Sequence, residues 1–139
     1  MSPELDEFLF ERYPALFVCR RALAVDDGWY DLLDALCHCL QEATANGDPQ
    51  VVAEQVKEKF GGLRFYTKAG PSDHQRGAIR MAELMSQRLC ETCGKPGKLQ
   101  KITPLGPIAT LCEEHLDRTR KEAQARYSEV VQPNNHFPL

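Results

Sequence analysis

Apolar residues recur at spacings of three and four along much of the chain, which is typical of helices that bury one face. The clearest run consists of Trp29, Leu32, Leu33, Leu36 and Leu40. It predicts an amphipathic helix that ends near Asn46-Gly47, where glycine supplies the C-terminal stop. A shorter helix is predicted after Ser2-Pro3-Glu4, because serine is a good N-cap and proline suits the first turn. Tyr13-Pro14 ends that helix.

Two further helices are predicted in the second half of the chain. Pro71-Ser72-Asp73 begins one of them, and its apolar stripe consists of Ile79, Ala82, Met85 and Leu89. This helix is expected to run directly into Cys90. The last helix is expected to span roughly residues 113 to 130, and the tail QPNNHFPL is expected to end the ordered fold.

The segment from residue 48 to 67 is compatible with two structures. Asp48-Pro49 resembles a helix start, with an apolar side made of Val52, Val56 and Phe60. In contrast, Phe60-Gly61-Gly62-Leu63 is typical of a two-residue hairpin turn between β-prone arms. We favour the hairpin because LRFYT is a good strand that needs a partner. Its expected register pairs Phe60 with Leu63, Glu58 with Phe65, and Val56 with Thr67.

Four candidate metal ligands occur as two pairs towards the C-terminus. Cys90 and Cys93 form a CxxC pair followed by Gly94, and eighteen residues separate Cys93 from the CxxH pair Cys112 and His115. Two residues between paired ligands let a tight turn direct both side chains at one ion, and glycine suits the sharp bend of a zinc knuckle. The pattern predicts a structural zinc site whose four ligands leave no open position.

The sequence between the two ligand pairs predicts a second hairpin. Short apolar runs at residues 99–102 and 108–111 flank a turn from Pro104 to Pro107. A knuckle, a hairpin and a helix that carries the second pair form the order of a treble clef. The alternative, buried thiols beside a solvated histidine, fits the spacing less well. Zinc is expected to fix the second long helix to the last helix in a region with few apolar residues.

Charge is distributed unevenly along the chain of 139 residues, whose net charge is −3. Residues 1–69 contain 7 Lys/Arg against 12 Asp/Glu, which gives −5, and residues 70–139 contain 10 against 8, which gives +2. Neither half is basic enough to indicate nucleic-acid binding by charge alone. No apolar run approaches the roughly 18 residues of a membrane span, and the N-terminus lacks a secretory pattern. We therefore expect a cytoplasmic protein with no membrane partner.

The remaining cysteines and histidines give little support to a catalytic site. His38 lies between Cys37 and Cys39 in a helical stretch, where adjacent side chains diverge, so a Cys–His nucleophile pair is not expected. Cys19, Cys37 and Cys39 are interpreted as small packing residues. His136 follows two asparagines, which superficially resembles the motif of HNH nucleases. Those nucleases have a general-base histidine ahead of the zinc hairpin, and this sequence has none there. We assign no catalytic residues and expect that the chain is not an enzyme.

Lys57, Lys59, Arg64 and Tyr66 are predicted to share one face of the first hairpin. Basic and aromatic side chains at this spacing could hold phosphate groups or an acidic partner. The alternative is a solvated face whose charges are paired and contribute little. These four residues are the candidate partner-binding site.

The segments VKEKFGGLRFY, LCETCGKPG and TLCEEH resemble a family of small bacterial and phage or prophage proteins, over roughly residues 27–116. The resemblance implies a bacterial cytoplasm and a phage or mobile-element origin, without an assigned activity. A looser similarity is to the DksA/TraR zinc-finger group, which bind RNA polymerase. This chain departs from that group because its fourth ligand is His115 and no long coiled coil precedes the zinc.

The sequence thus predicts an α+β, helix-rich fold with a β-hairpin and a C-terminal treble-clef-like zinc element. Residues 1–70 form an N-terminal α/β portion, residues 71–132 a helix with the zinc element and last helix, and residues 133–139 a tail. The favoured function is a non-enzymatic, zinc-stabilised binding protein from a phage or mobile element, which engages or inhibits a host protein such as a defence component. The alternatives are a regulatory zinc protein associated with nucleic acid or RNA polymerase and, less favoured, an enzyme with an unrecognised site.

Overall fold

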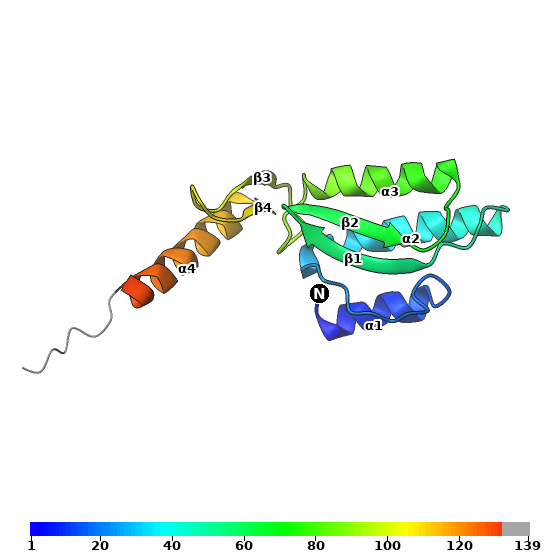
Figure 1. Cartoon of the computed structure of the whole chain (residues 1–139), viewed down its shortest axis with the longest axis horizontal. Coiled ribbons are helices and arrows are strands. Elements are labelled where there is room, and N and C mark those ends of the chain that lie inside the picture. The colour runs from blue at the N-terminus through cyan, green and yellow to red at the C-terminus, as the bar shows by residue number, and fades with distance from the viewer. Residues whose placement is uncertain (132–139) are drawn as a thin grey trace, which may run out of the picture.

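The computed structural model describes residues 1–131, which adopt an α+β fold in which helices predominate (Figure 1). The helices are α1 (Pro3–Arg12), the 3-10 turn η1 (Asp27–Trp29), α2 (Tyr30–Ala45), α3 (Asp73–Ser86) and α4 (Glu113–Val131). The strands are β1 (Ala53–Lys59), β2 (Gly62–Thr67), β3 (Lys98–Lys101) and β4 (Ile108–Leu111). They pair as the antiparallel hairpins β1–β2 and β3–β4. The predicted fold class is confirmed; the predicted tail lies outside the described residues.

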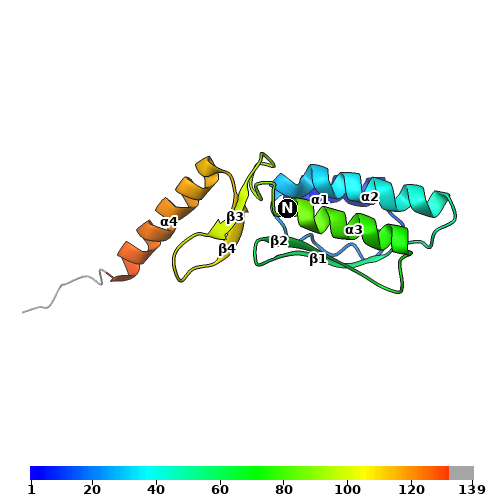
Figure 2. The same ribbon diagram turned by 90° about the horizontal axis from the view of Figure 1, so that it is seen from above.

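The hydrophobic core lies between hairpin β1–β2 and helices α1, α2 and α3. Figure 2 shows α2 and α3 side by side, with the hairpin along one side of them. Trp29, Leu33 and Leu63 are completely buried in this core. Helix α3 contributes Ile79 and Ala82 to the same core. The division of the chain at residue 70 stays a prediction; helices on both sides of that position, α1, α2 and α3, contribute to one core. In the described part of the chain, no helix combines the length and apolar character needed to cross a membrane.

Helix α3 begins as predicted but ends earlier than predicted. A capping box of Ser72 and Gln75 fixes its start, with each side chain bonded to the backbone of the other. The expectation that the helix runs into Cys90 is wrong, because α3 ends at Ser86. The chain then becomes extended, since Cys90 N donates to Lys95 O over 2.7 Å and the backbone of residue 97 pairs with that of residue 88. The first ligand pair therefore lies on a turn after the helix.

Hairpin β1–β2 forms as favoured, but its turn lies one residue earlier than expected. Phe60 and Gly61 occupy the turn with positive φ angles of 53° and 78°, as a type I′ turn requires. The expected pairs Phe60–Leu63, Glu58–Phe65 and Val56–Thr67 are therefore wrong; Val56 pairs with Phe65, and Glu58 with Leu63. The observed register places two buried apolar side chains, Val56 and Phe65, opposite each other on the core face.

Other segments of the chain cover both edges of hairpin β1–β2. On the outer edge of β2, Leu63 N donates to Ser86 Oγ over 2.9 Å and Phe65 N donates to Glu83 Oε2 over 3.2 Å. On the outer edge of β1, Ala24 forms a parallel bridge. Ala24 N donates to Val56 O, and Glu58 N donates to Ala24 O, both over 3.0 Å. Uncovered strand edges invite pairing with another chain. This hairpin therefore offers a partner its solvent face rather than an edge.

Candidate functional site

The four predicted ligands converge in a Cys3His cluster, Cys90, Cys93, Cys112 and His115, whose ligand atoms all lie within 4.8 Å of one another. The Sγ atoms of Cys93 and Cys112 are 3.9 Å apart. His115 Nδ1 lies 3.6 Å from Cys90 Sγ and 3.2 Å from Cys112 Sγ. A tetrahedral ion with bonds of about 2.3 Å to sulfur and about 2.0 Å to nitrogen separates its ligand atoms by roughly 3.5 to 3.8 Å. The cluster is therefore a candidate metal site with suitable geometry.

A tight turn presents the first ligand pair and packs against the chain before α2. Gly94 N donates to Cys90 O over 2.9 Å, and Gly94 has a φ angle of 77°. A Cβ atom on Gly94 would lie 2.8 Å from Gly28 O, and one on Gly28 would overlap Cys90 O. Two backbones approach too closely here for a side chain, so both positions require glycine. The sequence assigned Gly28 to a turn, and nothing in it indicated contact with the knuckle.

Two hydrogen bonds strengthen this contact between the knuckle and the start of α2. Gly28 N donates to Glu91 O over 2.8 Å, and Trp29 Nε1 donates to Leu89 O over 2.9 Å. The Trp29 ring is completely buried, so its N–H needs a partner inside the protein. The first ligand pair is thus anchored to the main core through the backbone on either side of Cys90.

The surroundings of Cys90 favour the thiolate form that a metal needs. Burial raises the pKa of the Cys90 thiol. The backbone N–H groups of Cys112, Cys93 and Thr92 lower the pKa by more than burial raises it, so that it is about 6. Metal ligands must be deprotonated, and a thiolate accepts such hydrogen bonds better than a thiol does. Three donors around one sulfur therefore support the assignment of Cys90 as a ligand.

The second ligand pair lies where β4 passes into α4. Leu116 N donates to Cys112 O over 2.9 Å, which closes the first turn of the helix, and His115 lies within that turn. Helix α4 has no buried residues. Farther along it, Arg120 Nε donates to Ile102 O over 2.9 Å. The ligand turn and Arg120 therefore attach a helix that has no fully buried residue.

Strand β4 also contacts the tip of hairpin β1–β2. Thr110 Oγ1 donates to Gly61 O over 2.7 Å, and Thr110 N donates to Glu91 Oε2 over 2.7 Å. Thr110 is completely buried, and Glu91 is only 7% exposed. Burial raises the pKa of Glu91, the Thr110 N–H lowers it, and the charges of Glu58 and Asp26 raise it, so that it reaches about 7. These residues connect the metal site to the hairpin, and no sequence pattern indicated them.

No family model, curated protein or solved structure matches this chain. The resemblances based on the KFGGLRFY segment and the two ligand pairs therefore remain predictions. Fold and site are interpreted from the residues and their geometry.

Lys57, Lys59, Arg64 and Tyr66 lie together on the solvent face of hairpin β1–β2. The observed register differs from the expected one by an even number of residues, so each face keeps its predicted composition. Lys57 Nζ lies 5.6 Å from the centre of the Tyr66 ring, and Lys59 Nζ lies 5.8 Å from that of Phe60. Among residues 1–131, none of the three cations forms an ion pair. Their role in partner binding stays a prediction.

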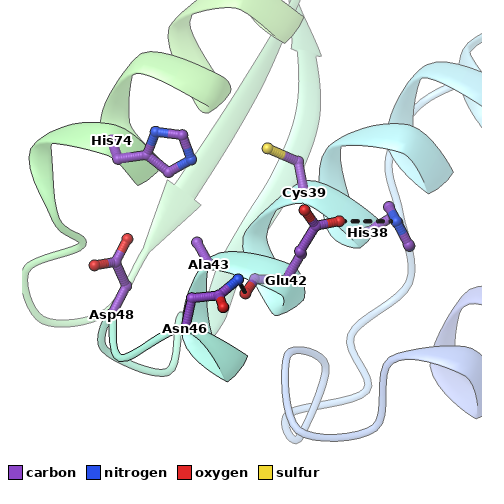
Figure 3. Close-up of a pocket in the computed structure, with 7 residues that line it drawn as sticks. All are labelled: His38, Cys39, Glu42, Ala43, Asn46, Asp48 and His74. Carbon is purple, nitrogen blue, oxygen red and sulfur yellow. Dashed lines mark hydrogen bonds and ion pairs between the residues drawn. The ribbon is translucent and has the colours of Figure 1, made fainter.

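A hollow between the end of α2 and the start of α3 contains other polar groups but has no convergent site (Figure 3). His38 Nε2 lies 3.3 Å from Glu42 Oε2, and both side chains are mostly exposed. Cys39 and His74 line the same hollow. Within the described residues, only the Cys3His cluster brings three or more Cys, His, Asp or Glu ligand atoms close enough for a metal.

The three remaining cysteines lie apart from the metal cluster. Cys37 is completely buried in the core, and burial raises the pKa of its thiol. Cys19 and Cys39 are half-buried. The interpretation of Cys37 as a packing residue is confirmed. His136 lies outside the described residues.

Proposed function

We propose that this chain is a zinc-stabilised binding protein without a catalytic centre, and that the solvent face of hairpin β1–β2 is its binding surface for an anionic partner. The observation that carries this proposal is the row of Lys57, Lys59 and Arg64 beside Tyr66, none of the cations paired with a carboxylate in the described chain. Unpaired cations on a rigid face attract and orient a partner of opposite charge.

Zinc is the metal that the Cys3His cluster suits best. Thiolate sulfur and imidazole nitrogen in a four-ligand tetrahedral set are the usual ligands of structural zinc. When all four positions are taken by protein, no position remains for water or substrate. The bound ion would supply a cross-link between chain segments, which supports a structural rather than a catalytic role.

The segment after α3 needs such a cross-link because it lacks a hydrophobic core of its own. Of residues 88–131, only Cys90, Glu91, Thr110 and Leu111 are buried. An element of this size with so little burial is not expected to fold without a metal or a disulfide. Zinc would thus hold β3, β4 and α4 in place, and Thr110 would hold β4 against the tip of the binding hairpin.

Two parts of this proposal rest on the sequence resemblance. They are the origin of the chain in a phage or mobile element and its action on a host target. An anionic host partner, whether a protein surface or a nucleic acid, fits the hairpin face by charge. Capture from bacterial lysate, with and without nuclease, identifies the partner by mass spectrometry.

The decisive comparison uses the double variant Lys57→Gln/Arg64→Gln and the matched control Arg118→Gln/Lys121→Gln. The control removes two exposed cations from α4 that pair only with acidic residues of the same helix. We expect the hairpin variant to lose the captured partner and the control to retain it. Equal recovery by both variants would exclude the hairpin face as the binding surface.

The zinc assignment is tested separately by elemental analysis of the purified chain. We expect one zinc per chain, its loss in Cys93→Ser, and its retention in the matched variant Cys39→Ser. A metal-free chain with an unchanged melting temperature would contradict the structural role.

A further inference from the structure

We propose that the solvent face of hairpin β1–β2 binds single-stranded nucleic acid, with phosphates at Lys57, Lys59 and Arg64 and unpaired bases stacked on Tyr66 and Phe60. This inference rests on the proposed function, which places the binding surface on this face. It names the anionic partner by its chemistry, a polyphosphate chain that carries flat bases.

The three cations are arranged so that they act together on a phosphate chain. Lys57 and Lys59 are two positions apart on β1, so their Cα atoms are about 6.7 Å apart on one face. Arg64 lies directly opposite Lys57 on β2. All three lie within about one Debye length of each other at physiological salt. They therefore form one local positive field for several successive phosphates.

Two exposed aromatic rings accompany these cations. Tyr66 is 40% exposed and Phe60 is 69% exposed. Each ring has a lysine Nζ within 6 Å of its centre, at 5.6 Å for Tyr66 and 5.8 Å for Phe60. Aromatic rings stack on unpaired bases with little sequence preference, and single-strand binders combine them with a basic groove. A single strand of nucleic acid would use both the cations and the flat faces of the two rings.

The net charge of −3 leaves three cations on this face, because the two carboxylates of hairpin β1–β2 lie away from them: Glu54 is exposed at the end of β1 away from the turn, and Glu58 belongs to the other face. Glu58 pairs with Leu63 on the opposite face, and its Oε1 accepts a hydrogen bond of 2.7 Å from Gly61 N. The exposed carboxylates of α1 belong to a helix beyond the edge of β1 (Figure 1). Charges beyond a Debye length of about 8 Å are largely screened.

Past Tyr66, at the end of the hairpin away from the turn, the surface carries charges of both signs. Gln55 pairs with Tyr66 on the same face, and it lines a small hollow together with Arg20, Arg21 and Glu54. Arg20 also forms an ion pair of 3.7 Å with Glu7. The cationic path for an extended strand therefore runs from the Phe60 turn to Tyr66, and hydrogen-bonding groups follow at Gln55. A duplex would instead have its bases paired and unavailable to both rings.

Fluorescence anisotropy with labelled twelve-nucleotide oligothymidylate and oligouridylate tests the inference on the zinc-loaded full chain. Contact with three phosphates of a single strand predicts that affinity falls roughly 20-fold between 50 and 200 mM salt. Lys59→Gln should reduce that loss to roughly sevenfold, because one phosphate contact is removed. The control Lys121→Gln, on exposed α4, should leave the salt dependence unchanged.

Two aromatic variants test stacking without loss of the fold. Tyr66→Leu keeps an apolar side chain, and Phe60→Asn suits the positive φ angle of the turn. Each should weaken binding by at least about fivefold. Tighter binding of uridylate would identify RNA, and tighter binding of thymidylate would identify DNA, as the preferred strand.

Three results would overturn the inference: no saturable binding at 50 mM salt, equal or tighter binding of a duplex of the same length, or unchanged affinity in both aromatic variants. The lysate experiment separates this failure from failure of the proposed function. If a nuclease-resistant partner is still lost from Lys57→Gln/Arg64→Gln, the surface is right and the ligand is wrong. If those substitutions change no partner, the surface itself is wrong.

Discussion

Thr110 and Gly61 are 49 residues apart in the sequence, yet Thr110 Oγ1 donates a buried hydrogen bond of 2.7 Å to Gly61 O. Gly61 lies in the turn of the proposed binding hairpin, and Thr110 lies two residues before the ligand Cys112. The bond therefore joins the segment that carries the candidate metal site to the segment proposed to bind a partner. If a metal orders the first segment, the position of the hairpin tip should depend on it.

Replacement of Thr110 by valine should lower the free energy of unfolding by about 1–3 kcal/mol. The change keeps the shape of the side chain but leaves the buried Gly61 carbonyl without its donor. Urea denaturation of the zinc-loaded protein measures the loss. Thr110→Ser keeps the hydroxyl and should recover most of the stability. If valine is as stable as threonine, the hydrogen bond to Gly61 O does not contribute to stability.

Removal of zinc by a chelator should unfold the C-terminal element and spare the main core. Only four side chains of residues 88–131 are buried, whereas α2 contributes Leu33, Leu36 and Leu40 to a large apolar core. Hydrogen exchange should then show fast exchange in β3, β4 and α4, with continued protection in α2. Simultaneous loss of protection in both regions would show that the chain unfolds as one unit and would contradict a local role for the metal.

Phe60→Asn should raise the free energy of unfolding by about 0.5–1 kcal/mol. Phe60 has a φ angle of 53° at a turn position where a bulky side chain is strained. Asparagine tolerates this conformation, and Asn-Gly is the preferred pair for a type I′ turn. Thermal melting measures the gain. Phe60→Val should destabilise the protein, because a β-branched residue is poorly accommodated at positive φ; a stabilising valine would refute this account of the turn.

Local patterns in the sequence were sufficient for the starts of the helices and for the ligand set, but not for the end of α3. The capping residues Ser2 and Ser72 were readable because a cap acts within three positions of itself. Cys90, Cys93, Cys112 and His115 were readable for a similar reason, since the spacing within each pair reflects the geometry of one turn. Only the assembly of the two pairs required the three-dimensional structure.

Contacts between distant segments could not be read from the sequence in this way. Gly28 looks like an ordinary turn residue until Gly94 is placed against it, and Thr110 looks like an ordinary strand residue until it meets Gly61. The hairpin register was mispredicted for a related reason. Gly61-Gly62 suits a turn locally, but the observed turn at Phe60-Gly61 places the buried side chains of Val56 and Phe65 directly opposite each other in the core.

The carboxylate of Asp34 provides a test of pH dependence away from the metal site. Its Oδ1 accepts hydrogen bonds from Tyr13 OH over 2.7 Å and from Arg12 Nη1 over 2.9 Å. Burial raises the pKa of Asp34, but the hydrogen bonds from Tyr13 and Arg12 lower it more, so it lies below its usual value of 3.8. A depressed pKa means that the stabilisation is complete above about pH 4 and is lost as the pH falls through the folded-state value.

Asp34→Asn should therefore be less stable than the parent chain by about 1 kcal/mol at pH 7, a hydrogen-bond estimate reduced for the exposed Arg12. The difference between the two proteins should shrink as the pH falls below 4, because the carboxylate of the parent protein becomes protonated first in the unfolded state and then in the folded state. Both proteins are denatured at each pH, and their free energies of unfolding are compared. Loss of zinc in acid affects both proteins equally and therefore cancels in the difference. The control Asp117→Asn, in an exposed pair with Lys121, should differ little from the parent at any pH. A deficit for Asp34→Asn that stays the same from pH 7 to pH 3 would show that its charge is not what stabilises the fold.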